Sequence, residues 1–209
     1  MHEAISAGLA ALDLRVSRAE AAQLDAYLDL LARWNRVHNL TGVKSRDAMT
    51  RRHLAESLAL RSALRGSRIA DVGSGAGLPG IPLAIVAPER EFTLIESRAK
   101  RAAFLRHVTG ALVLRNVKVV ESRVEHLRDA GPFDTVLARA VASLPELVGL
   151  TAHLLDANGV LLVPTKAEFA AEAARIDAPF RVERIEPAGR DVLRGALVQI
   201  RRTDDQNFE

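Results

Sequence analysis

The sequence predicts an α/β fold in which a mostly parallel β-sheet follows a helical N-terminal extension. From residue 68 onward, short apolar runs alternate with helical segments, an order typical of βαβ units with right-handed crossovers. Before that point, apolar residues recur at helical spacing instead. We therefore expect a helical extension over residues 1–66 and an α/β domain over residues 67–209, packed as one compact unit.

The extension contains two predicted helices, which a shorter helical segment around residues 3–12 precedes. Ser17 and Glu20 form a capping-box pattern, and the apolar residues that follow recur at helical spacing, which predicts an amphipathic helix over 18–36. A polar segment then breaks the period, and a second helix is expected over 47–64.

The α/β domain is predicted from seven apolar runs that have the length of strands. These expected strands cover residues 68–72, 92–95, 117–120, 135–137, 160–163, 181–185 and 197–200. Helices are expected between them over 81–86, 98–112, 144–155 and 167–176. A loop that contains proline and glycine joins the last two strands, so they form a closing pair.

The first predicted strand ends in a glycine-rich turn, Asp-Val-Gly-Ser-Gly-Ala-Gly-Leu-Pro-Gly, over residues 71–80. Glycines there take positive φ freely and let a ligand lie against bare backbone. Gly75, Gly77 and Gly80 fit the G-x-G-x-x-G spacing of dinucleotide-binding proteins. However, Asp71 occupies a position that is usually apolar in that motif. Asp-x-Gly-x-Gly-x-Gly is the usual first motif of S-adenosylmethionine-dependent methyltransferases. We therefore favour a methyltransferase over a dinucleotide-binding enzyme, and over a turn with a structural role alone.

Ligands of open parallel sheets bind beyond the carboxyl ends of the strands. Glu96 ends the second strand, and its two oxygens can accept both hydroxyls of a ribose. Residues 121–125 form a short turn that can sandwich an adenine. Arg139 follows the fourth strand and either pairs on a helix face or points into the cleft, and we favour the cleft. Lys166 follows the fifth strand, where it meets a substrate phosphate or lies in water.

Composition excludes several kinds of chemistry. The chain has no cysteine, which rules out disulfides, thiolate metal sites and a cysteine nucleophile. We see no cluster of metal ligands, no signal peptide and no apolar run of membrane-spanning length, so we expect a cytoplasmic protein without a metal. A purine ring nitrogen accepts a methyl group without a base or a metal, by proximity and in-line orientation alone.

Basic residues are concentrated in two stretches. Residues 33–68 contain nine Arg or Lys against two acidic residues, and residues 98–128 contain eight against two. Such local excess is expected where a protein contacts phosphates, although solvated helix faces also produce it.

Three runs in the sequence closely resemble the glucose-inhibited division protein B family. They are Trp-Asn-x-x-His-Asn-Leu-Thr at 34–41, Arg-His-Leu-x-Glu-Ser at 52–57, and the glycine turn with its Leu-Pro-Gly-Ile-Pro extension. The resemblance spans about residues 20–166. Members of this family are bacterial methyltransferases that modify a guanine at N7 in small-subunit (16S) ribosomal RNA.

The resemblance implies a class I, Rossmann-like methyltransferase domain whose last strand is antiparallel, with S-adenosyl-L-methionine as cofactor. It also implies ribosomal RNA or a ribosomal subunit as partner, and we expect a monomer that binds no membrane. Together with the strand-end argument, it predicts a set of cofactor-binding residues: Gly73, Gly75, Leu78, Glu96, Val124, Glu125 and Arg139. No catalytic acid or base is expected.

The substrate-binding residues that we expect are Asn39, Arg51, Arg52, His53 and Lys166. Asn39 is the candidate for touching the nucleobase, and capping the second helix is its alternative role. Glu96 stands where many family members have an aspartate, and Pro164-Thr-Lys166 departs from the commoner Lys-Gly ending. Two other functions stay open: methylation of another RNA or a small molecule, and a non-catalytic, nucleotide-binding regulatory role.

Overall fold

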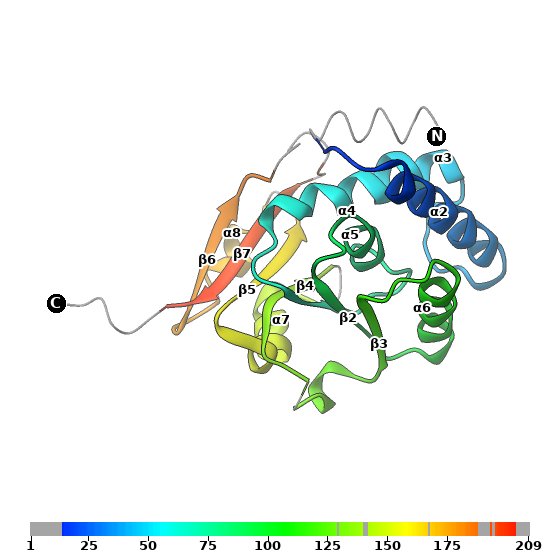
Figure 1. Cartoon of the computed structure of the whole chain (residues 1–209). Coiled ribbons are helices and arrows are strands. Elements are labelled where there is room, and N and C mark those ends of the chain that lie inside the picture. Colours follow the sequence, from blue (N-terminus) through cyan, green and yellow to red (C-terminus); the bar gives the residue numbers. More distant parts are fainter. Residues whose placement is uncertain are drawn as a thin grey trace.

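The computed structural model of the chain describes residues 14–128, 130–139, 142–166, 168–187, 193 and 195–203. It contains a seven-stranded sheet in the order β3-β2-β1-β4-β5-β7-β6 (Figure 1). The strands are β1 (Arg68–Val72), β2 (Glu91–Glu96), β3 (Val117–Glu121), β4 (Phe133–Ala138), β5 (Leu155–Thr165), β6 (Phe180–Ile185) and β7 (Ala196–Arg202).

The directions of the strands confirm the predicted fold class. Strands β1 to β5 pair in parallel, and β7 inserts antiparallel between β5 and β6. Strands β2 and β3 extend the sheet on one side of β1, whereas β4 and β5 extend it on the other side, so the order of the strands reverses at β1. A reversal of this kind leaves a crevice at the carboxyl ends of the strands.

The described helical segments cover both faces of the sheet. They are α2 (Arg18–His38), α3 (Arg46–Ala48), the π-helical turn η1 (Met49–Leu54), α4 (Ala55–Ala59), η2 (Leu60–Ala63), α5 (Gly80–Val86), α6 (Ala99–Ala111), η3 (Val124–His126), α7 (Leu144–Thr151), η4 (Ala152–Leu154) and α8 (Ala170–Ala173). Residues 1–13 of the expected extension lie outside the described residues.

Helix α2 begins at the predicted capping box. The Ser17 hydroxyl accepts a hydrogen bond from the Glu20 N–H at 3.1 Å, and the Glu20 carboxylate accepts one from the Ser17 N–H at 2.6 Å. The apolar stripe of the helix, which includes Leu28, is buried against Ile81 of α5 and Phe104 of α6. The extension therefore covers the face of the sheet on which α5 and α6 lie (Figure 1).

The second expected helix, over 47–64, is wrong as a single helix. It is divided into α3, η1, α4 and η2. Thr50 donates to the carbonyl of Arg46, and Ser57 donates to the carbonyl of His53. Hydroxyls that bond the preceding turn in this way compete with the α-helical ladder and bend it. The interruption lies beside the cavity described below.

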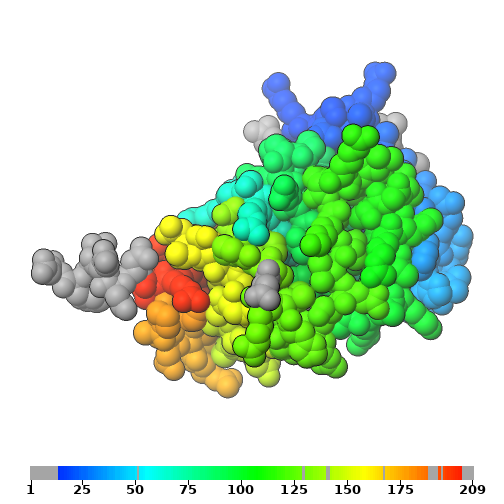
Figure 2. All heavy atoms as spheres, turned by 60° about the horizontal axis from the view of Figure 1, so that its bottom comes forward, coloured from blue at the N-terminus to red at the C-terminus, as the bar shows by residue number. Residues whose placement is uncertain are grey.

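The start of α2 and the C-terminal strands β6 and β7 lie at different sides of the molecule (Figure 2). Figure 2 shows the described part of the extension (blue) along the top and right of the molecule, and the C-terminal strands (orange and red) at the left. On the sheet face opposite α2, Val136 and Ala70 pack with Leu147 of α7. The sheet is thus buried on both faces, as a parallel sheet requires.

Candidate functional site

A cavity of about 870 Å³ lies at the carboxyl ends of the parallel strands. Loops that follow β1, β2, β4 and β5 form one part of its wall, and residues 40–60 of the extension form another. Eight residues predicted from the sequence line it together: Arg52, His53, Gly73, Gly75, Leu78, Glu96, Arg139 and Lys166. Segments more than 100 residues apart in the chain thus meet at one site.

The glycine turn is held in shape by backbone hydrogen bonds. Gly73 and Gly75 have φ angles of 69° and 58°, which favour glycine. The Gly73 N–H donates to the carbonyl of Ile95 at 2.9 Å. An added Cβ at Gly75 would approach only the carbonyl of Gly73 and the guanidinium of Arg101, at 3.6 and 3.8 Å. The turn therefore presents bare backbone to the cavity.

Asp71 lies beneath this turn and is 1% exposed. Its Oδ2 accepts a hydrogen bond from the Gly80 N–H at 3.0 Å, at the end of the glycine turn. Burial raises the pKa of Asp71 to about 7, against the lowering effects of the Gly80 N–H and of Arg139. Its function in the free protein is to fix the start of α5.

Glu96 ties the cavity edge of β2 to the glycine turn. One carboxylate oxygen accepts the Gly75 N–H at 2.9 Å, and the other accepts the Arg98 N–H at 2.8 Å. The residue is 4% exposed and still lines the cavity. Because each carboxylate oxygen has room for a second donor, the group keeps the capacity to accept hydroxyls of a ligand.

Arg139 both lines the cavity and pairs with the extension. Its Nη1 lies 3.8 Å from Oε2 of Glu56 in α4. The other oxygen of Glu56 lies 3.9 Å from Nε of Arg52. The two roles that the sequence left open for Arg139 are therefore combined, since the guanidinium reaches the cleft and meets a helix there. Lys166 lines the cavity from the end of β5.

His53 is buried in the extension wall of the cavity. Its Nε2 lies 2.7 Å from the hydroxyl oxygen of Thr41. Burial, together with the charges of Arg139 and Arg52, lowers the pKa of His53 to about 4. The imidazole is therefore neutral at pH 7, so this side chain binds other groups through hydrogen bonds.

Sequence reasoning did not identify Thr41 and Asn35 as parts of the site. The Asn35 side chain accepts the Thr41 N–H at 2.8 Å and donates to the carbonyl of Val43 at 3.0 Å. It thereby shapes the loop that carries Thr41. The available signal was an asparagine in the last turn of an amphipathic helix, close to the apolar face.

Four predicted residues are not placed in the cavity wall. Asn39 is exposed and ends α2 in the left-handed region at φ 48°. Its alternative role as cap of the second helix is wrong, because the Ser45 side chain accepts from Ala48 N–H there. Val124 is buried among the residues packed with α7, and Glu125 is exposed in η3. The Arg51 side chain lies outside the described residues.

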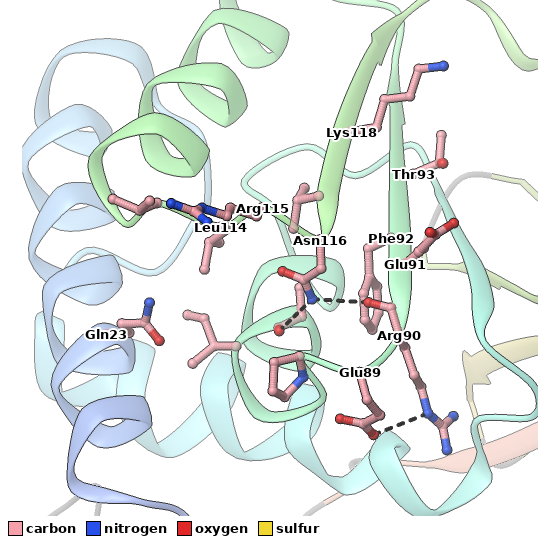
Figure 3. A pocket seen from close by; sticks show the side chains of 15 residues that line it. Gln23, Glu89, Arg90, Glu91, Phe92, Thr93, Leu114, Arg115, Asn116 and Lys118 are labelled. Carbon is pink, nitrogen blue, oxygen red and sulfur yellow. Dashed lines mark hydrogen bonds and ion pairs between the residues drawn. The ribbon is translucent and has the colours of Figure 1, made fainter.

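A second cavity, of about 630 Å³, lies at the opposite end of β2 and β3 (Figure 3). The Asn116 amide group within it already donates to the carbonyls of Ala84 and Arg90, at 3.0 and 3.1 Å. Glu89 lies 3.7 Å from Arg90. None of the described residues that are predicted to bind cofactor or substrate lines this cavity, so the larger cavity is the better candidate site.

The described ranges contain neither a metal-binding cluster nor a membrane-spanning helix. No group of three or more His, Cys, Asp or Glu residues is arranged there to hold a metal ion. In the same ranges, no helix has both the length and the apolar character that crossing a bilayer requires.

The sequence profile of the GidB family, described as rRNA small subunit methyltransferase G, matches residues 20–188. A protein named ribosomal RNA small subunit methyltransferase G from Nitrosospira multiformis is 48% identical over 147 residues, which are 70% of this chain and 68% of the relative. A protein of the same name from Aromatoleum aromaticum is 44% identical over 185 residues, covering 86% and 88% of the two chains.

Solved structures with much lower sequence identity share the fold. An SAH-bound methyltransferase of Podospora anserina aligns with a TM-score of 0.57 at 18% identity, covering 91% of this chain and 98% of that one. A ribosomal protein L11 methylase of Lactobacillus delbrueckii subsp. bulgaricus aligns with a TM-score of 0.54 at 14% identity, covering 73% and 79%.

Proposed function

Because this chain belongs to the rRNA small subunit methyltransferase G family, we propose that it transfers a methyl group from S-adenosyl-L-methionine to N7 of a guanine in 16S ribosomal RNA. One observation carries the proposal. The family match over residues 20–188 includes the glycine turn, Glu96, Arg139 and the extension wall with His53, which line one cavity. A cytoplasmic location follows from the proposed substrate.

The cavity wall fits the proposed cofactor. Gly73 and Gly75 offer bare backbone to its methionine part, and Leu78 provides an apolar contact next to them. The fixed carboxylate of Glu96 accepts the ribose hydroxyls. We assign Val124 and Glu125, which follow β3 and lie outside the wall of the cavity, to the adenine. Arg139, which follows β4, is assigned as the cation that faces the cofactor. When bound, S-adenosylmethionine supplies an electrophilic methyl group on its sulfonium.

The proposed reaction needs no proton acceptor in the protein. The lone pair of guanine N7 is free at neutral pH, so the residues of the site have to orient the base and exclude competing geometries. Two of the acidic side chains that line the cavity, Glu96 and Glu56, are already engaged with N–H groups or guanidinium groups. The positions of these two carboxylates suit the binding and orientation of ligands in the cavity.

The proposed RNA surface consists of Asn39, Arg51 and Arg52 of the extension, together with Lys166 from the end of β5. Arg52 is 48% exposed and lines the cavity. Arg46 belongs to the same basic stretch but is bound to Asp25 and Asp29 at 2.5 and 2.6 Å. It therefore serves to hold α3 against α2, and we exclude it from the surface.

Binding of 16S RNA should weaken steeply with salt, because each neutralised phosphate releases counterions. The double variant Arg51→Ala with Arg52→Ala should reduce the slope of log affinity against log salt by about one to two. Filter binding at several salt concentrations measures the slope. Arg181→Ala with Arg184→Ala, on the edge strand β6, is the matched control and should leave the slope unchanged. Equal slopes for all three proteins would contradict the assigned surface.

The function is tested with S-adenosylmethionine that carries a radiolabelled methyl group. The protein is incubated with small ribosomal subunits and, separately, with deproteinised 16S RNA, and the label is mapped by cleavage at 7-methylguanine. Label at N7 of a guanine supports the proposal. Label in another RNA or in a small molecule favours a different methyltransferase. Calorimetric binding of the cofactor without any transfer favours a non-catalytic, nucleotide-binding role.

A further inference from the structure

One ring nitrogen of His53 is paired, and the other is buried without a partner. Nε2 lies 2.7 Å from the hydroxyl oxygen of Thr41. Nδ1 has no hydrogen-bond partner, although the residue is only 7% exposed and lines the large cavity. Buried polar atoms of a folded protein are nearly always paired, so an orphaned one in a cavity wall indicates a missing ligand atom.

The partners of Thr41 determine which nitrogen of His53 carries the hydrogen. The Thr41 hydroxyl oxygen accepts the Val43 N–H at 3.3 Å. The hydroxyl hydrogen of Thr41 is free to point at His53 Nε2, and we assign Thr41 as the donor in this contact. Burial and the charges of Arg139 and Arg52 keep the ring neutral, so with Thr41 as donor the single hydrogen of the ring lies on Nδ1. The wall of the cavity therefore contains a buried N–H donor that binds no described residue.

The proposed methyl acceptor carries a matching acceptor atom. Guanine presents N7 and O6 side by side on its major-groove edge, whereas adenine presents an amino group, a donor, beside N7. We propose that the Nδ1–H of His53 donates a hydrogen bond to O6 of the target guanine, which places N7 for methylation and selects guanine over purines that lack O6. This inference rests on the proposed function and adds a residue that determines base specificity.

The position of His53 favours the base over the cofactor as its partner. His53 is in η1 of the extension, next to Arg52 and within the stretch of basic excess. The residues assigned to the cofactor lie instead on loops that follow the strands of the sheet. The carboxylate of the cofactor is the competing acceptor for the His53 N–H. If it were the partner, substitution of His53 would weaken binding of the cofactor, whereas a bond to the base predicts unchanged affinity.

Three substitutions at His53 test the assignment. His53→Asn keeps an N–H near the place of Nδ1, His53→Gln moves the amide toward the place of Nε2, and His53→Phe removes both. Each variant is first checked by its thermal unfolding midpoint and by calorimetric titration with S-adenosylmethionine. Single-turnover methylation is then measured on RNA with guanine at the mapped position and on RNA with 2-aminopurine there, which keeps N7 but lacks O6.

The unaltered protein should methylate the guanine RNA about 10- to 100-fold faster than the 2-aminopurine RNA, the discrimination expected of one or two good hydrogen bonds to a base. His53→Phe should lose this preference, because its rate falls on guanine alone. His53→Asn should recover part of it and His53→Gln should not. All variants should bind S-adenosylmethionine as the unaltered protein does.

Three results would overturn the inference: an unchanged base preference in His53→Phe, equal behaviour of the Asn and Gln variants, or a loss of cofactor affinity that accounts for the fall in rate. Failure of the proposed function has a different signature. The unaltered protein would then place no methyl group on guanine N7 in either RNA, whatever residue stands at position 53.

Discussion

Arg139 acts on buried groups from several parts of the chain. Its guanidinium lies 3.8 Å from Glu56 of α4. Its charge adds to the lowering of the pKa of His53 by burial and opposes the raising of the pKa of Asp71 by burial. With 30% of its side chain exposed, it is partly desolvated, so its charge is felt more strongly than that of a surface arginine. One cation thus influences the electrostatics of both cavity walls.

Arg139→Ala should weaken binding of S-adenosylmethionine by about tenfold or more, the loss expected when a partly desolvated cation that faces the ligand is removed. Calorimetric titration measures the affinity. Arg184→Ala is the matched control, because Arg184 is exposed on β6 and pairs with its near neighbour Glu186. Equal affinities in the two variants would show that Arg139 does not face the cofactor.

Asp71 should make stability depend on pH. Its folded pKa is about 7 against an ordinary aspartate value of 3.8, so the folded state retains a proton that the unfolded state releases between these values. Its stabilising contribution is complete below pH 3.8 and is lost as pH rises through 7. Relative to Asp71→Asn, the free energy of unfolding should therefore fall by at most about 1.4 kcal/mol per pH unit from pH 5 to 7.

Urea denaturation of both proteins at several pH values measures this difference. His53, whose pKa is lowered, contributes with the opposite sign between its folded value of about 4 and its ordinary 6.5, but it is present in both proteins. Parallel stability curves for the two proteins would mean that Asp71 is ionised throughout this range.

At the scale of elements, helix α2 supports the glycine turn directly. The buried Tyr27 hydroxyl donates to the carbonyl of Ala76 at 2.8 Å. Burial raises the pKa of Tyr27, so the hydroxyl stays a donor at all working pH values. Through this bond, an element of the extension fixes the backbone that faces the cavity.

Tyr27→Phe should lower the free energy of unfolding by about 1–3 kcal/mol, because it leaves a buried carbonyl unpaired. It should also weaken cofactor binding, since Ala76 lies within the glycine turn. Gln23→Leu is the control: Gln23 is also on α2 and donates to the carbonyl of Leu112 at 3.0 Å, away from the turn. That variant should lose stability and keep its affinity. Loss of affinity in both would assign the effect to the packing of α2 as a whole.

At the scale of the whole molecule, the extension and the sheet share one core. Leu24, Leu28 and Leu31 of α2 are fully buried in the same cluster as Ile81 and Phe104. If α2 separated from the sheet, its apolar face would be exposed to water, which is unfavourable. We therefore propose that residues 1–66 and 67–209 fold as one cooperative unit.

Urea unfolding followed by two signals tests this proposal. Trp34 is the only tryptophan in the sequence and lies in α2, 5.4 Å from the ring of Phe104, so its fluorescence reports on the extension. Far-ultraviolet circular dichroism reports on all elements. The two transitions should coincide, and Leu28→Ala should shift both together by about 2–5 kcal/mol. A fluorescence transition at lower urea would contradict a single unit.

Structural features that depend on neighbouring residues along the chain could be predicted from the sequence alone. The capping box of Ser17 and Glu20 fixed where α2 begins, and the alternation of apolar runs fixed the order of strands and helices. The rule that ligands lie at the carboxyl ends of parallel strands then placed Glu96 and Arg139 at one cavity. These features follow from local hydrogen bonds and from the periods of helix and strand, which a single sequence displays.

Features that depend on contacts between distant segments became visible in the folded structure alone. The π-helical turn at 49–54 interrupts a sequence that reads as one helix, and the Thr41 hydroxyl meets His53 across it. Asn39 ends α2, and Tyr27 reaches a carbonyl 49 residues away. Periodicity reports which face of an element is apolar, but it does not report which partner a buried polar atom finds. That choice is made when the elements pack and every buried donor competes for an acceptor.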